Sequence, residues 1–265
     1  MKKLTEKEIQ NYICELLKRY IRFCNDNHLT YYIAYGSLLG TVRHKGFIPW
    51  DNDLDVMMPR EDYTKFITLA KDALGFQIKE RSLVSGYMYD YAKITDGITR
   101  IETFYMKDIK DMGVFIDIFP MDPVYIPDEE YENVKKKIDF NHSMMIMSGS
   151  KRIRPSKNGF RLFLKRFAYI YSKIRGTKYW LNEKDKIIAD AQKETGCANR
   201  YIVGEDIISS KYFHGKAVEK EFENIPVACP SDFTGLLTEL YGDFMQLPPM
   251  ENRISTHDFV AYIMD

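Results

Sequence analysis

The chain has 265 residues, 45% of them hydrophobic, and its 38 basic side chains are balanced by 38 acidic ones. This length and composition suffice to bury a core in one large domain, or in one domain with an appended subdomain, which excludes a disordered or fibrous protein. Zero net charge and the lack of a known reading motif also argue against a nucleic-acid partner.

Signals for export or membrane insertion are not found in the sequence. No segment approaches the roughly 20 apolar residues that cross a bilayer, and the start, MKKLTEKEIQ, lacks the apolar core of a secretion signal. We therefore expect a cytoplasmic protein. Its cysteines have no C-x-x-C spacing and no histidine cluster beside them, so we expect buried thiols rather than zinc ligands or disulfides. They are Cys14, Cys24, Cys197 and Cys229.

The sequence pattern of residues 1–127 predicts alternating helices and strands. Thr5 and Glu8 form a T-x-x-E capping box before apolar residues at helical spacing, which predicts a helix to about Asn27. Then follow a strand at YYIAY, a helix starting at Ser37, a strand at DLDVMM and a helix from Arg60 to about Ala73. Further strands are predicted at FQIKE, YMYDYAKI, ITRIETFYM and GVFIDIF. The fold class is therefore α/β (α+β), a mixed sheet flanked by helices.

Residues 128–265 are predicted to form a second, mostly helical region packed on residues 1–127. The expected helices are Asp128 to about Met147, Gly159–Ile174, Leu181–Lys193 and one near Ser231–Tyr241. A polar, proline-bearing loop is expected after the last of them.

One charge asymmetry interrupts this region. From Phe140 to Asn182 there is no acidic residue, whereas ten basic residues lie between positions 151 and 178. The segment GFRLFLKRFAYIYSKIR mixes these charges with Phe, Leu and Tyr, as an interfacial helix does. Three interpretations stay open: peripheral membrane contact through residues 151–178, a grip on an anionic polymer, or a helix with an aromatic core face and solvated charges.

Closely spaced acids suggest a metal site. In a strand the side-chain period is two, so Asp53 and Asp55 are predicted to project from one face while Leu54 enters the core. Neighbouring carboxylates repel one another unless a cation lies between them, and hard ions such as Mg²⁺ take oxygen ligands. Asp117 in VFIDIF offers a third ligand from a neighbouring strand, although it could instead cap a turn or pair with a base. Asp51 could join the ligands or fix the loop.

A Gly-Ser pair precedes these acids. Gly36 and Ser37 lie between a strand and a helix start, where exposed amides and the Ser37 hydroxyl can hold a phosphate at the positive end of the helix dipole. The basic run Arg43-His44-Lys45 lies between this anion site and the acids, where a phosphate-bearing ligand would pass. A merely solvated loop is the alternative.

These features together resemble a known family. GSLLGTVRHKGFIPWDNDLDVMMPREDY, GVFIDIFPMD and the tail LYGDFMQLPPMENRISTHDF are similar to the signatures of the LicD family, which is related to the fukutin-type proteins within the nucleotidyltransferase-fold superfamily. The resemblance implies transfer of a phospho-alcohol, most often phosphocholine, from a CDP-linked donor. The acceptor would be a hydroxyl of a cell-surface glycan precursor, free or lipid-linked, as in teichoic acid, lipopolysaccharide or capsule.

The resemblance also implies a site. Asp53, Asp55 and Asp117 would be catalytic and bind Mg²⁺ or Mn²⁺. Arg43, Lys45 and Lys93 are candidates for phosphate contacts, and Arg253 and His257 for a tail that closes over the site, with a general base as an alternative for His257. A choline group would need aromatic faces, for which Tyr87, Tyr89 and Tyr91 are candidates on one face of a strand.

Rival functions fit less of the pattern. Asp53-Leu54-Asp55-Val56 also matches the nucleophile loop of haloacid-dehalogenase-type phosphatases, but that loop needs an apolar strand directly before it. Glycosyltransferases use D-x-D without accounting for Gly36-Ser37 or Asp117. A nucleotidyltransferase or a non-catalytic nucleotide-binding protein on the same fold remains the alternative.

Overall fold

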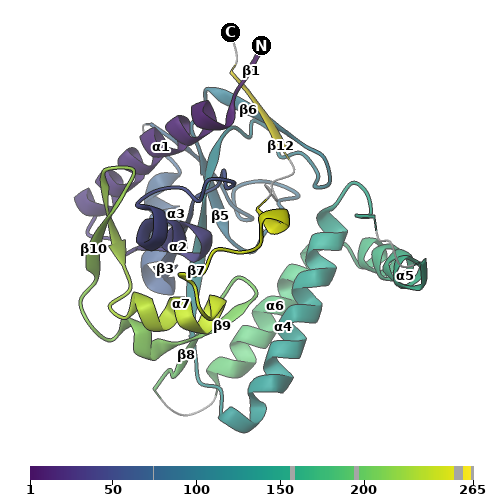
Figure 1. Ribbon diagram of the computed structural model, residues 1–265. Coiled ribbons are helices and arrows are strands. Elements are labelled where there is room, and N and C mark those ends of the chain that lie inside the picture. Colours follow the sequence, from purple (N-terminus) through teal and green to yellow (C-terminus); the bar gives the residue numbers. More distant parts are fainter. Residues whose placement is uncertain (74, 156–158, 194–196, 254–258, 264–265) are drawn as a thin grey trace.

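The computed structural model describes residues 1–73, 75–155, 159–193, 197–253 and 259–263 (Figure 1). The α-helices are α1 (Glu6–Asp26), α2 (Tyr35–His44), α3 (Arg60–Ala70), α4 (Asp128–Gly149), α5 (Gly159–Arg175), α6 (Thr177–Gln192) and α7 (Phe233–Tyr241). Short 3-10 helices are η1 (Ser210–Phe213) and η2 (Met250–Asn252). The strands are β1 (Lys2–Lys3), β2 (Tyr32–Ile33), β3 (Asp55–Pro59), β4 (Gln77–Lys79), β5 (Ala92–Thr95), β6 (Thr99–Thr103), β7 (Phe115–Val124), β8 (Arg200–Val203), β9 (Asp206–Ser209), β10 (Val218–Phe222), β11 (Ile225–Cys229) and β12 (Phe259–Ile263).

A seven-stranded mixed sheet forms the centre of the molecule. Its main path runs β2-β3-β7-β5-β4, and β8 and β9 extend it from the distal end of β7. The β3–β7 pair is parallel, and the other pairs are antiparallel. Two smaller sheets, β1-β12-β6 and β10-β11, lie around it. The predicted α/β architecture is confirmed.

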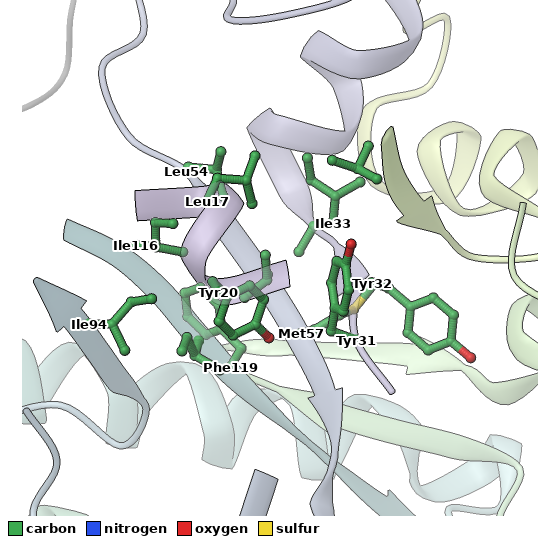
Figure 2. Close-up of a cluster of buried hydrophobic side chains, with 14 of the residues drawn as sticks. Leu17, Tyr20, Tyr31, Tyr32, Ile33, Leu54, Met57, Ile94, Ile116 and Phe119 are labelled. Atoms are coloured by element: carbon green, nitrogen blue, oxygen red, sulfur yellow. The ribbon is translucent and has the colours of Figure 1, made fainter. Parts of the chain in front are cut away.

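The N-terminal helix covers this sheet and shows why the sequence folds locally as expected. The Thr5 side chain accepts from the Glu8 N–H and the Glu8 carboxylate accepts from the Thr5 N–H, so the capping box is formed. The apolar stripe of α1 is buried against the strands: Figure 2 shows Leu17 and Tyr20 among side chains of the sheet. The Tyr20 ring contacts Phe66 of α3 edge-on at 5.6 Å between centroids.

The C-terminal half contributes both a helical pair and strands. Helices α4 and α6 pack together, and a buried side-chain amide, Asn141 Nδ2, donates to the Trp180 carbonyl at 3.0 Å. Strand β8 pairs with β7, and β12 brings the tail back to β6. None of the helices in the described residues is long and apolar enough to span a membrane.

Several expectations for individual elements were wrong. Five strands, β8 to β12, lie in the half predicted to be helical with a closing loop. The tight β10–β11 hairpin forms because Glu223 and Asn224 both adopt positive φ, 49° and 60°, as a type I′ turn requires. Cys197 is exposed, whereas Cys24 and Cys229 are buried as expected. Residues 87–91 precede β5 as irregular backbone, so their tyrosines do not alternate along a strand.

Candidate active site

Three charged side chains lie side by side across the centre of the sheet. In the parallel β3–β7 pair Asp55 is directly opposite Asp117, and in the antiparallel β5–β7 pair Asp117 is directly opposite Lys93. Directly paired residues project to the same face of a sheet. The placement of Asp117 beside Asp55 on a neighbouring strand is therefore confirmed.

The charges in this row lie close together. Burial, followed by the negative charges of Asp53 and Asp117, raises the pKa of Asp55 well above its usual range. The buried Lys93 ammonium forms an ion pair with Asp117 Oδ1. It also lies over the aromatic rings of Phe115, Tyr89 and Tyr91, at 3.9, 4.7 and 5.1 Å from their centroids. One buried cation thus faces a group of carboxylates.

The other two acids belong to the loop before β3. The strand begins at Asp55, so the expectation that Asp53 belongs to the strand was wrong, and Asp53 lies in the preceding loop. Its side chain still lines the same cavity as Asp117 and is close enough to Asp55 to raise its pKa. Asp51 approaches helix α2: a methyl group on Gly36 would lie 3.0 Å from Asp51 Oδ2. The sequence places a glycine at this contact because a larger side chain would displace the carboxylate.

Ser37 connects helix α2 to strand β3. Its hydroxyl accepts a hydrogen bond from the Asp55 N–H at 2.9 Å, which fixes the point where the strand begins. The helix starts at Tyr35 rather than Ser37, and Tyr35 has φ 46°, an uncommon conformation for a bulky residue. The Tyr35 hydroxyl donates to the Val203 carbonyl at 2.7 Å, which holds this turn in place.

Gly40 allows the backbone at Gly46, just after the end of α2, to lie close against this helix. A Cβ at this position would lie 2.4 Å from the Gly46 carbonyl oxygen, a backbone atom that cannot rotate away. We expect Gly40→Ala to lower the free energy of unfolding by about 1–3 kcal/mol in chemical denaturation, despite the better helix propensity of alanine. Gly159→Ala is the matched control, because no atom lies within 4 Å of its added methyl. Equal stability of the two variants would contradict the close contact.

A cavity of about 250 Å³ opens beside the charged row. Its lining combines three kinds of side chain: acids, cations and aromatic rings. The acids are Asp53, Asp108 and Asp117, the cations are Lys93, Lys107 and Arg154, and the rings are Tyr89, Tyr91, Phe115 and Phe259. Sequence reasoning missed Lys107, Asp108 and Arg154, since no motif marks them and only the fold brings them to this wall.

The remaining candidates lie elsewhere on α2 and the tail. Arg43 donates to the Phe244 carbonyl at 3.0 Å, and Arg253 lies over the Trp50 ring at 5.7 Å, so the tail does contact the motif loop. Burial and the nearby Arg253 charge lower the pKa of Arg43. Lys45 is exposed, and its carbonyl accepts from the Glu223 N–H in the β10–β11 turn rather than facing the cavity. His257 is outside the described residues.

The acids fit a metal by their chemistry. In the part of the chain that the structure describes, there is no group of three histidine, cysteine or acidic side chains placed so that it could hold a metal ion. Lys93 provides the counter-charge at Asp117. Asp53, Asp55 and Asp117 nevertheless offer only oxygen ligands, and burial together with the charges of Asp53 and Asp117 raises the pKa of Asp55. Such a set of oxygen ligands suits a hard divalent cation.

Part of the chain that contains these residues matches a known family model. The family model described as LicD/FKTN/FKRP, nucleotidyltransferase domain, matches residues 28–158, which include α2, the charged row and most of the cavity lining. This match and the full-length similarity described below support a LicD family member, and the full-length relative is named as a transferase.

Among individual relatives, the lipopolysaccharide cholinephosphotransferase LicD of Haemophilus influenzae is 29% identical over 279 residues, which cover all of both chains. An uncharacterised protein of Rickettsia typhi is 29% identical over 125 residues, 46% of this chain and 38% of that protein. An uncharacterised protein of Rickettsia prowazekii is 44% identical over 48 residues, 18% of each chain.

Proposed function

We propose that this enzyme transfers phosphocholine from CDP-choline to a hydroxyl of a lipopolysaccharide precursor. The observation that carries the proposal is the direct pairing of Asp55 with Asp117 and of Asp117 with Lys93, beside a cavity of mixed cationic and aromatic lining. The full-length similarity to a lipopolysaccharide cholinephosphotransferase supports the choice of donor group and acceptor. Teichoic acid or capsule precursors are chemically equivalent acceptors.

The lining suits both ends of such a donor. The diphosphate carries negative charge, for which Lys93, Lys107 and Arg154 are the cations at hand. The choline end is a quaternary ammonium, which is attracted by aromatic faces such as those of Tyr89, Tyr91 and Phe115. Tyr87, by contrast, is 4% exposed and does not line the cavity.

We propose Asp53, Asp55 and Asp117 as the residues that would hold Mg²⁺ or Mn²⁺. A divalent ion bound there would neutralise negative charge on the diphosphate and on the departing CMP. The protein's own contribution is positional. The Ser37 hydroxyl sets the start of β3, the Gly36 contact places Asp51, and the sheet register keeps Asp55 and Asp117 adjacent.

The proposal places the enzyme in the cytoplasm, where CDP-linked donors are made and glycan precursors are assembled. A non-catalytic nucleotide-binding protein or a nucleotidyltransferase on the same fold would use the same acids, so the test must separate binding, donor cleavage and the choice of phosphorus.

The test is CMP release from CDP-choline, CDP-ethanolamine and CDP-glycerol in magnesium buffer, with UDP-glucose as the unrelated donor. We expect release from one or more CDP-alcohols, fastest from CDP-choline, and none from UDP-glucose. Removing the divalent ion with EDTA should abolish release. Calorimetric binding of CDP-choline without any release, even with lipooligosaccharide as acceptor, would favour the non-catalytic alternative, and absence of both would reject the proposal.

A further inference from the structure

Helix α5 presents an apolar stripe to solvent. Seven of its apolar side chains recur at helical spacing and are 43–77% exposed: Phe160, Phe163, Leu164, Phe167, Ile170, Tyr171 and Ile174. Spacing of three and four residues puts them on one side of the helix. A helix on the surface of a globular protein normally turns such a stripe inward, so the orientation of α5 is reversed. Figure 1 shows the helix at the edge of the molecule, beyond α4 and away from the sheet.

The opposite, more polar side of α5 fixes this orientation. Ser172 is fully buried and its carbonyl accepts from Trp180 Nε1 at 3.2 Å. The Tyr169 hydroxyl donates to the Lys151 carbonyl at 3.1 Å, and Lys173 Nζ donates to the Ser148 carbonyl at 2.8 Å. Turning the apolar stripe toward the body would break all three contacts. The stripe is therefore held outward by specific hydrogen bonds.

The charges around the stripe indicate what can cover it. Residues 140–182 contain no acid, and Arg166 and Arg175 are exposed on α5. A second copy that met this face with its own would bring two blocks of positive charge together, which is unfavourable. An anionic bilayer surface offers both an apolar phase for the stripe and negative charge for the arginines.

Residues 150–154, which come shortly before α5 in the chain, lie beside the cavity. Ser150 forms a β-bridge with Met106, the Lys151 N–H donates to the Tyr105 carbonyl, and Arg154 lines the cavity together with Asp53 and Asp117. The polar side of α5, which contacts Ser148 and Lys151, therefore lies next to the segment that carries Arg154 of the cavity lining.

We propose that α5 docks in the headgroup layer of an anionic membrane, with its apolar stripe inserted and its arginines at the phosphates. The docking brings the cavity to the membrane surface. The proposal that this position serves to receive a lipid-anchored glycan rests on the proposed function. The docking itself does not depend on it.

The test is co-sedimentation of the full chain with vesicles of equal parts phosphatidylglycerol and phosphatidylcholine, compared with vesicles of phosphatidylcholine alone. We expect binding to the anionic vesicles. Phe163→Ser with Phe167→Ser should weaken it on the order of tenfold or more, and Arg166→Gln with Arg175→Gln on the order of tenfold. The control, Leu69→Ser with Ile98→Ser, removes side chains that are 47% and 49% exposed outside α5 and should bind as the wild type does.

Two readouts keep this test independent of folding and of the proposed function. The changed side chains are exposed, so all variants should keep the wild-type melting temperature, and the α5 variants should release CMP from soluble CDP-choline at the wild-type rate. Absence of vesicle binding, equal binding to neutral vesicles, or wild-type binding by the phenylalanine variant would overturn the docking. A dimer in solution that the phenylalanine changes dissociate, without vesicle binding, would replace the membrane by a second copy.

Discussion

Asp117→Asn should reduce CMP release from CDP-choline by at least about a thousandfold, because electrostatic stabilisation of a transferring phosphoryl group is a matter of several kcal/mol. Asp117 is the central member of the row: it is directly opposite both Asp55 and Lys93 and is 6% exposed. Asparagine keeps the shape but removes the charge, leaving the Lys93 ammonium without its ion-pair partner. The measurement is the initial rate per folded molecule, with folding checked by circular dichroism.

Asp122→Asn is the matched control for that experiment. Asp122 is also on β7, is 5% exposed and is also paired with a cation, since Arg60 donates to it at 2.6 and 2.5 Å. It does not line the cavity. We expect this variant to be less stable but to retain the wild-type rate per folded molecule. Comparable losses in the two variants, or a rate within tenfold of wild type for Asp117→Asn, would mean that the row is structural.

Lys184→Met should lower the free energy of unfolding by about 3–5 kcal/mol, as expected when one member of a buried ion pair is removed. Lys184 on α6 forms an ion pair with Asp90 and also donates to the Gly204 carbonyl, and the two side chains are 4% and 9% exposed. These contacts join α6 to the segment before β5 and to the β8–β9 turn. Chemical denaturation measures the loss.

The same pair predicts a pH dependence. Burial alone would raise the pKa of Asp90, but the charge and hydrogen bond of Lys184 outweigh it, so the pKa is lowered on folding. A carboxyl group of this kind stabilises the protein above its unfolded pKa, and the stabilisation is lost as the pH falls through the folded value. The stabilisation from Asp90 in the wild type should hence be full at neutral pH and be lost below about pH 4. In Lys184→Met burial raises the pKa of Asp90, so the difference in unfolding free energy between the two proteins should begin to shrink before the pH has fallen to this value.

Two further variants isolate the buried pair. Asp90→Asn with Lys184→Met removes both charges and should recover part of the lost stability. Arg81→Met breaks an ion pair with Asp185 at 3.0 Å, in which the two side chains are 35% and 48% exposed. It should lower the free energy of unfolding by less than about 1 kcal/mol. If Lys184→Met costs no more than Arg81→Met, the buried pair does not hold these elements together.

Local patterns in the sequence predicted the features that depend on neighbouring residues. The capping box of α1 is formed by two side chains three positions apart, and Asp117 could be assigned to a strand because apolar residues flank it on both sides. That this strand pairs with β3 followed from the family resemblance and from the need for further metal ligands. The sequence was therefore sufficient to expect Asp55 and Asp117 on neighbouring strands, as the structure has them.

Features set by long-range pairing could not be predicted. Lys93 is opposite Asp117 only because β5 and β7 pair in one particular register, and nothing within β5 specifies that register. The tyrosines at positions 87, 89 and 91 have strand-like composition, yet they lie outside β5. Strands β8 and β9 are four residues each and depend on β7 for their hydrogen bonds. Arg154 reaches the cavity through the fold of the segment after α4.

The most direct test of the proposed chemistry follows both halves of the donor at once. CDP-choline labelled in the choline methyl groups and, separately, in the cytidine ring is incubated with the enzyme, magnesium and lipooligosaccharide, and the labels are then traced. Our account predicts choline label in the glycan and cytidine label in free CMP, both lost in Asp117→Asn. Cytidine label in the glycan, with release of phosphocholine, would contradict it and would show a nucleotidyltransferase.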